Sequence, residues 1–226
     1  MRTRKKTAFT LAEVLITLAI IGVVAALTLP SLTQYYKKCA ASTALRKFYS
    51  AMSQAIIMSQ VDNGDPEHWD FTCSVKNSDG TTDYETTNTN TYKFLSTYIL
   101  PYIRYDKLSG GVYTAATETK SASYEKYYLH LSDSSVVTFW LGNCMDMLFD
   151  VNGEKEPNIE GKDIFRFTFC FNFSNSHYTT GFYPYLKDNV SDRESALSKC
   201  KSNAAYCSVL LWYDNWKFKD DYPYKL

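Results

Sequence analysis

The feature that most constrains this chain is an unbroken apolar segment near its N-terminus. Residues 9–29 read FTLAEVLITLAIIGVVAALTL, and Glu13 is the one ionisable side chain among these 21 residues. At about 1.5 Å per residue, a helix of this length crosses the hydrocarbon core of a bilayer. The preceding residues 2–6 carry four basic side chains, which favour the cytoplasmic side of a membrane. The sequence therefore predicts an anchored chain whose remainder lies outside the cytoplasm.

An ordinary secretory signal peptide is the alternative interpretation of this segment. Signal peptides have a shorter apolar stretch, about 7–15 residues, that ends in a small-x-small cleavage site. Residues 24–26 (VAA) could serve as such a site, so this alternative stays open. Glu13 argues against a plain anchor, because an acid near the bilayer centre costs about 2.5–3.5 kcal/mol and requires a partner.

The residues around Glu13 carry a family resemblance. Residues 6–15 (KTAFTLAEVL) resemble the prepilin-type cleavage and methylation motif of type IV pilins, type II secretion pseudopilins and competence pseudopilins. The resemblance implies cleavage between Ala8 and Phe9, N-methylation of Phe9, and pairing of Glu13 with a terminal amine in the assembled filament. Ala8 stands where the family usually has glycine. Pro30 matches the helix-kinking proline of many such proteins.

The resemblance also implies how the chain is organised. We expect a cleaved basic leader (1–8), a transmembrane helix (9–29), an amphipathic continuation of that helix (30–62) and an extracytoplasmic globular head (63–226). The expected fold is α+β, with the long N-terminal helix packed on an antiparallel sheet. The continuation carries an apolar stripe at helical spacing, which predicts one buried face. The stripe consists of Ala41, Leu45, Phe48, Met52 and Ile56.

Patterns within the head predict its further elements. Residues 63–66 (NGDP) should end the helix, and the polar residues 74–91 are expected to form a long exposed loop or a lightly structured insertion. Residues 127–131 and 136–141 predict a hairpin, and five alternating phenylalanines from Phe165 to Phe173 predict a strand with one buried face. Residues 209–212 are interpreted as a short strand.

Six cysteines in a chain with an export-like N-terminus favour disulfides over a metal site, because no Cys-x-x-Cys pair is present. Cys200 and Cys207 resemble the cysteine-bounded C-terminal loop of many pilins, which implies that they pair. Spacing alone leaves the other pairings open. One arrangement joins Cys144 to Cys170 and leaves Cys39 with Cys73.

An acidic segment is the one candidate metal site in the sequence. Its oxygen-bearing side chains alternate around glycine turns, a pattern suited to Ca²⁺, and some pseudopilins hold Ca²⁺ in a loop of the head. A polar turn between two strands is the alternative, and no cofactor is required by the fold. The candidate ligands are Asp150, Asn152, Glu154 and Asp163, with Glu156 and Asn158 in reserve.

Composition and motifs argue against two other classes of function. The 24 basic and 24 acidic residues cancel, so we do not expect a nucleic-acid partner. His68, His130 and His177 are widely separated, and no nucleophile elbow, zinc-protease motif or phosphate-binding glycine loop is present. The chain is therefore interpreted as non-enzymatic.

Together these features predict a structural subunit, a pseudopilin or minor pilin of a type IV pilus or type II secretion filament. Its expected partners are prepilin peptidase, other pilin or pseudopilin subunits, the membrane, and exported cargo or a surface ligand. We expect a single-pass membrane protein with an extracytoplasmic head, located in a cell-surface or periplasmic filament after assembly. The alternatives are a permanently anchored binding or adhesion module and a DNA-uptake pilin.

Overall fold

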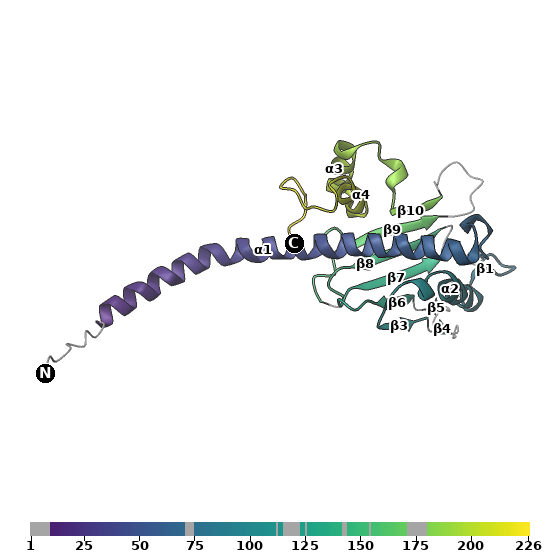
Figure 1. Ribbon diagram of the computed structural model, residues 1–226, viewed down its shortest axis with the longest axis horizontal. Coiled ribbons are helices and arrows are strands. Elements are labelled where there is room, and N and C mark those ends of the chain that lie inside the picture. Colours follow the sequence, from purple (N-terminus) through teal and green to yellow (C-terminus); the bar gives the residue numbers. More distant parts are fainter. Residues whose placement is uncertain are drawn as a thin grey trace.

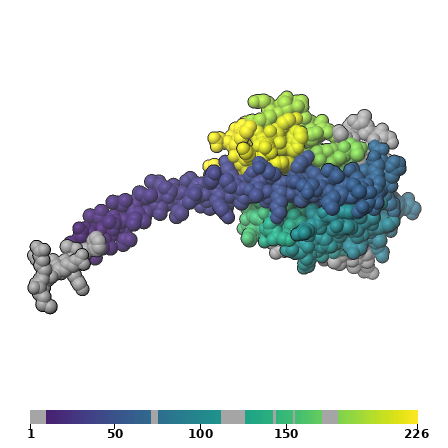
Figure 2. Space-filling model, viewed as in Figure 1, coloured from purple at the N-terminus to yellow at the C-terminus, as the bar shows by residue number. Residues whose placement is uncertain are grey.

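One long helix and one antiparallel sheet define the architecture. The computed structural model describes residues 10–70, 75–111, 113–114, 123–124, 126–141, 144–153, 155–170 and 180–226. Helix α1 (Leu11–Asn63) projects far beyond the head at its N-terminal end and lies across the sheet at its C-terminal end (Figure 1). Figure 2 shows this second half lying along the surface of the head, between the C-terminal helices on one side and the remaining elements on the other. The predicted α+β fold is confirmed.

Helix α1 ends where its sequence predicts. It runs through Pro30 without interruption and ends at Asn63. Gly64 caps this end at φ 77°, a conformation that residues with a Cβ rarely adopt, and its N–H donates to the carbonyl of Gln60. The buried face of α1 contains all five predicted stripe residues together with Ala55 and Ser59. The amphipathic half of the helix therefore supplies one side of the core.

Within the described residues, six strands form the main sheet in the order β10-β9-β8-β7-β6-β3, and all neighbours are antiparallel. The strands are β3 (Lys107–Gly110), β6 (Tyr127–His130), β7 (Val136–Leu141), β8 (Met145–Asp150), β9 (Ile164–Cys170) and β10 (Gly181–Pro184). The predicted hairpin is confirmed as β6 and β7. Two small pairs complete the strands: β1 (Val75–Lys76) with β2 (Thr82–Asp83), and β4 (Tyr113–Thr114) with β5 (Ser123–Tyr124).

Aromatic side chains fill the space between α1 and the sheet. Phe165 and Phe167 of β9 lie on the buried face, as their alternation predicts. Phe48 of α1 stacks on Phe149 of β8 with ring centroids 4.2 Å apart, and meets Phe167 edge-on at 5.1 Å. Such contacts stabilise the layer beyond the burial of apolar area. Two further phenylalanines of the predicted strand, Phe171 and Phe173, lie outside the described residues.

The prediction of an exposed loop at residues 74–91 was wrong for residues 84–91. Helix α2 (Tyr84–Tyr98) occupies much of this segment, and the side chain of its N-cap Asp83 accepts a hydrogen bond from the Thr86 N–H at 3.0 Å. Polar Thr87 and Thr91 are buried, with the Thr91 hydroxyl bonded to a carbonyl of its own helix. Thr and Asn are weak helix formers, and tertiary packing overrides their propensity here. Short 3₁₀ turns precede and follow α2, at η1 (Pro66–His68) and η2 (Leu100–Tyr102).

The prediction of a strand at residues 209–212 was also wrong. These residues belong to helix α4 (Cys207–Tyr213), in which Val209, Leu210 and Leu211 are all fully buried. A short apolar run buried on every side fits a helix or a strand equally well, so its periodicity carries no information. The remaining C-terminal elements are η3 (Lys187–Asn189), α3 (Arg193–Ser202) and η4 (Ala204–Tyr206).

The aromatic C-terminal segment closes the head against α1. Trp216 is buried, with its ring 4.9 Å from that of Tyr49 on α1 and 5.7 Å from that of Phe167 on β9. Asp214 is almost fully buried beside the guanidinium of Arg193, at 2.6 Å. A buried carboxylate of this kind is tolerated because it is paired and hydrogen-bonded. The C-terminal segment is therefore part of the packed core.

Candidate functional site

The N-terminal motif begins outside the described residues, which leaves Ala8 and Phe9 unplaced and Glu13 within α1. Glu13 closes a capping box with Thr10. The Thr10 N–H donates to Glu13 Oε2 at 2.8 Å, and the Glu13 N–H donates to Thr10 Oγ1 at 3.3 Å. The sequence signal for this arrangement, a threonine three residues before a glutamate, was present in the motif but not used in the prediction. In the single chain, the Glu13 carboxylate therefore has a partner on its own helix.

The first half of α1 presents apolar side chains on all sides. Within the described residues, α1 is the one helix long and apolar enough to cross a membrane, and none of its apolar stretch is buried. Leu11 is 77% exposed and Leu27 is 75% exposed. Contiguous apolar surface of this extent marks a membrane or protein interaction site. This half of the helix thus requires a partner that the head does not supply.

The hydroxyl groups along this half are satisfied within the helix. Thr17, Thr28, Ser31 and Thr33 each donate to a backbone carbonyl three or four residues earlier, at 2.6–2.9 Å. Such bonds remove the cost of placing a hydroxyl in hydrocarbon. The part of α1 that suits a bilayer therefore extends past the apolar run, to Thr33.

Two protein families match parts of this chain. Residues 31–226 match a family of unknown function (DUF6613), and residues 3–29 match the prokaryotic N-terminal methylation motif. The chain belongs to the DUF6613 family. No curated protein and no solved structure matches it.

The match to the methylation motif identifies the class of protein to which this chain belongs. The motif covers three of the four basic residues, the expected cleavage position and the whole apolar segment. This match supports the resemblance of residues 6–15 to the prepilin-type motif. The chain is a type IV pilin-like protein of the kind that prepilin peptidase processes. Proteins with this motif are structural and not enzymatic. One long apolar helix with a separate head fits a single-pass membrane anchor that carries a soluble domain.

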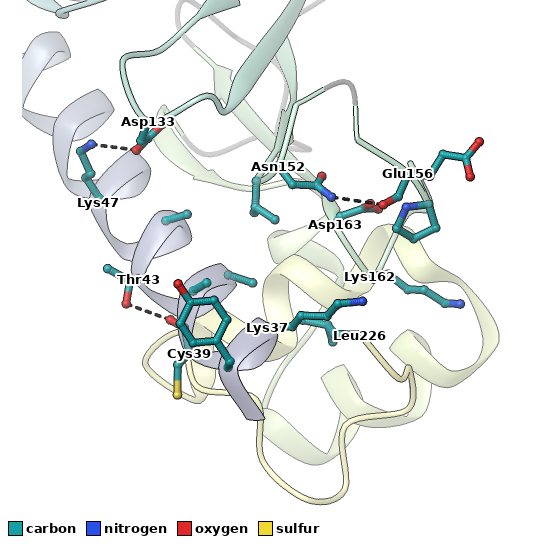
Figure 3. Close-up of a pocket in the computed structure, with 16 residues that line it drawn as sticks. Lys37, Cys39, Thr43, Lys47, Asp133, Asn152, Glu156, Lys162, Asp163 and Leu226 are labelled. Carbon is teal, nitrogen blue, oxygen red and sulfur yellow. Dashed lines mark hydrogen bonds and ion pairs between the residues drawn. The ribbon is translucent and has the colours of Figure 1, made fainter. Parts of the chain in front are cut away.

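A groove of about 650 Å³ lies where α1 enters the head. Its wall on α1 is formed by small residues, among them Ala40 and Ala44, and its opposite wall by the loop after β8 and by Leu226 (Figure 3). Lys47 of α1 also forms an ion pair, at 2.7 Å, with Asp133 in the turn between β6 and β7. Sequence reasoning missed this groove, because its second wall comes from segments roughly 115 and 185 residues further along the chain than the first.

The acidic segment forms a loop that is held by hydrogen bonds from its backbone to aspartate side chains. Both carboxylate oxygens of Asp163 accept backbone N–H bonds, from Asn158 at 2.9 Å and from Ile159 at 2.7 Å. Asp150 accepts the Asn152 N–H at 3.1 Å. Burial of Asp150, reinforced by the nearby Asp163 carboxylate, raises its pKa to about 6.

The metal prediction for this loop is not tested by these contacts. Glu154 lies outside the described residues, so the predicted ligand set cannot be assembled from Asp150, Asn152 and Asp163 alone. Among the described residues, no three His, Cys, Asp or Glu side chains come together as metal ligands. The two reserve positions, Glu156 and Asn158, lie in the same loop.

The cysteines form two disulfides within the described part of the chain. Cys200 joins Cys207, which links α3 to α4, and Cys144 joins Cys170, which links the start of β8 to the end of β9. The alternative that joined Cys39 to Cys73 was wrong, because Cys39 carries a free, exposed thiol. Cys39 lies 24 residues before the end of α1, about 36 Å along the helix, whereas Cys73, outside the described residues, follows that end.

A second cavity of about 440 Å³ lies on the face of the sheet that α1 does not cover. It follows a row of cross-strand neighbours, Lys107, His130, Val136, Asp150 and Ile164. The His130 ring nitrogen Nε2 lies 2.8 Å from the Ser109 hydroxyl. This contact gives His130 a structural partner; His68 does not line the cavity, and His177 lies outside the described residues.

Proposed function

We propose that the chain is a pseudopilin or minor pilin, a structural subunit of a type IV pilus or type II secretion filament. Prepilin peptidase would remove residues 1–8, and the subunit would assemble through its N-terminal helix. The observation that carries the proposal is the methylation motif on a helix whose first half is apolar and exposed while its second half is built into the head. Energy for assembly would come from other proteins.

The geometry of α1 supports a role in assembly. The apolar half continues directly into the buried stripe, so a force applied to the anchor acts on the head without an intervening loop. Glu13 sits in the capping box of the single chain, and in a filament it would exchange this local partner for the methylated amine of a neighbouring subunit. Pairing of the two charges would avoid an isolated ion in an apolar bundle.

The head would determine which partners the subunit meets. The groove beside α1 and the cavity on the open sheet face are two concave surfaces of the described residues that could contact other subunits, exported cargo or a surface ligand. Assembly would place the head outside the cytoplasm, at the cell surface or in the periplasm. The disulfides of the head agree with an oxidising compartment.

Processing is the step that separates this proposal from its rivals. The full chain, produced with and without prepilin peptidase, would be purified from membranes and its N-terminal peptide identified by mass spectrometry. A chain that begins at N-methyl-Phe9 only when the peptidase is present supports the proposal. An intact N-terminus with active peptidase identifies a permanently anchored module, and a chain that begins after Ala26 identifies an ordinary secreted domain.

A matched pair of variants sharpens the experiment. Ala8→Gly restores the residue usual at the cleavage position and should speed processing. Ala25→Gly makes the same change within the apolar helix and should leave the rate of processing unchanged. If Ala8→Gly is processed no faster than Ala25→Gly, residue 8 does not direct cleavage in the way the motif implies.

A further inference from the structure

Four residues surround α1 between its apolar half and the head. Tyr35 and Tyr36 are 67% and 73% exposed, and Lys37 and Lys38 follow them directly. Consecutive residues of an α-helix are turned by about 100°, so four in succession cover nearly the whole circumference. We call residues 35–38 the collar.

The distance from Glu13 places the collar relative to a bilayer. From Glu13 to Thr33 the helix rises by about 30 Å, which equals the thickness of a typical hydrocarbon core. Every hydroxyl between these two residues is bonded to a helix carbonyl, so the segment has no free polar side chain to lie in hydrocarbon. The collar begins two residues after Thr33, about 3 Å further along. It therefore falls at the level of the headgroups when Glu13 lies at the opposite boundary.

The chemistry of the collar suits that level. Tyrosine rings with an apolar body and a polar hydroxyl concentrate at membrane interfaces, and lysines there extend their ammonium groups to lipid phosphates. Within the described residues, neither Lys37 nor Lys38 takes part in an ion pair. Both ammonium groups thus remain available for phosphate oxygens.

We propose that the collar binds phospholipid headgroups at the outer face of the membrane and fixes the height of the head before assembly. Tyr36 and Lys37 belong to both the collar and the groove, so a collar at the headgroup level would place the opening of the groove directly above the lipid surface. The inference rests on the proposed membrane anchoring of α1, and goes beyond it by naming the residues that contact lipid and the level at which they lie.

Depth measurements with nitroxide labels test the position of the collar. Full-length protein with Cys73→Ser is labelled at the native Cys39, one residue beyond the collar, and reconstituted into vesicles containing phosphatidylglycerol. Two reference proteins carry both Cys39→Ser and Cys73→Ser, and are labelled at Ala26→Cys to report hydrocarbon or at Ser202→Cys to report water. We expect the Cys39 label to show the accessibility of the headgroup region, between these two references.

The references separate failure of this inference from failure of the proposed anchoring. If the label at residue 26 is as accessible to water as the label at residue 202, then α1 does not insert and the proposed anchoring fails. If the label at residue 26 lies in hydrocarbon but Cys39 is as accessible as residue 202, the helix inserts and the collar inference is overturned.

Lipid selectivity tests the lysines. In vesicles of mixed phosphatidylglycerol and phosphatidylcholine, spin-labelled lipids beside the wild-type protein should favour the anionic lipid by about fivefold or more, the effect of roughly one effective lysine charge near the surface. Lys37→Gln with Lys38→Gln should bring this preference close to one. The control pair Lys201→Gln with Lys217→Gln, both exposed on the head, should retain it. Equal preference in the two pairs would overturn the assignment.

Bilayer thickness tests the tyrosines. In wild type, the Cys39 label should keep the same headgroup-level accessibility in thin and thick bilayers, because the collar holds its depth. Tyr35→Ser with Tyr36→Ser should let that accessibility vary with thickness. Tyr92→Ser with Tyr105→Ser, exposed tyrosines of the head, should behave as wild type. A label that follows thickness equally in all three proteins would refute a role for the tyrosines.

Discussion

Phe48 should be the side chain whose loss most weakens the attachment of α1 to the head. It is 2% exposed and stacks on Phe149 at 4.2 Å, with two further aromatic rings edge-on within 6.1 Å. Truncation of a buried phenylalanine to alanine costs about 3–5 kcal/mol, through lost burial and the cavity that remains. This is a large share of the 5–15 kcal/mol that stabilises a typical domain.

The effect can be measured by urea unfolding of the full chain in detergent micelles, followed by the fluorescence of the buried Trp69 and Trp216. With a slope of about 2 kcal/mol per molar urea, Phe48→Ala should lower the midpoint by about 1.5–2.5 M. Val61→Ala, on the same helix but 81% exposed, should change stability by less than about 0.5 kcal/mol. If Phe48→Ala lowers the midpoint no more than Val61→Ala does, the aromatic layer does not hold α1 on the sheet.

Three further predictions concern the head. Replacing both cysteines of the β8–β9 disulfide by serine should lower the free energy of unfolding by about 3.5 kcal/mol, and the same change in the α3–α4 disulfide by about 2.5 kcal/mol, because the first closes a loop of 26 residues and the second a loop of 7. A larger drop in the urea midpoint for the α3–α4 pair would contradict the loop-entropy account. Burial raises the pKa of Asp146, so the folded state holds its proton to higher pH than the unfolded state, and stability should fall as pH rises through that range. Asp146→Asn should therefore have a higher urea midpoint than wild type at pH 7 and lose this advantage below about pH 4. Asp163→Asn should lower the free energy of unfolding by roughly 1–3 kcal/mol by weakening its two hydrogen bonds to backbone N–H groups, and Ca²⁺ should raise the thermal midpoint of wild type but not of this variant. If neither Ca²⁺ nor chelator changes the wild-type midpoint, the metal prediction is wrong and Asp163 only stabilises the loop.

The sequence predicts the parts of this structure that depend on strong, regular patterns. The apolar helix, its buried stripe, its stop at Gly64 and the β6–β7 hairpin all follow from periodicity and turn chemistry that act within about 15 residues. The disulfide between Cys200 and Cys207 came only from the family resemblance, since spacing left the pairings open. The second disulfide was one arrangement among several.

The two wrong predictions and the missed groove share a physical cause. Helix α2 is rich in Thr and Asn, and becomes helical because Phe94 and Leu95 are buried and because Asp83 caps its start. Helix α4 has no polar face, so no period distinguishes it from a strand. The groove is formed by α1, the loop after β8 and Leu226, which meet only after folding. Local sequence carries none of these long-range contacts.

The two halves of α1 bury their apolar side chains in different surroundings, so membrane anchoring and folding of the head can be perturbed separately. Twelve large apolar side chains between Leu11 and Leu32 are exposed in the single chain. Full burial of one such side chain contributes about 1.5–3 kcal/mol, so even at half that value the twelve contribute roughly 9–18 kcal/mol. This equals or exceeds the expected stability of the head. A variant that unfolds the head, such as Phe48→Ala in urea, should therefore leave the chain in the membrane, whereas a change in the collar should move the head without unfolding it.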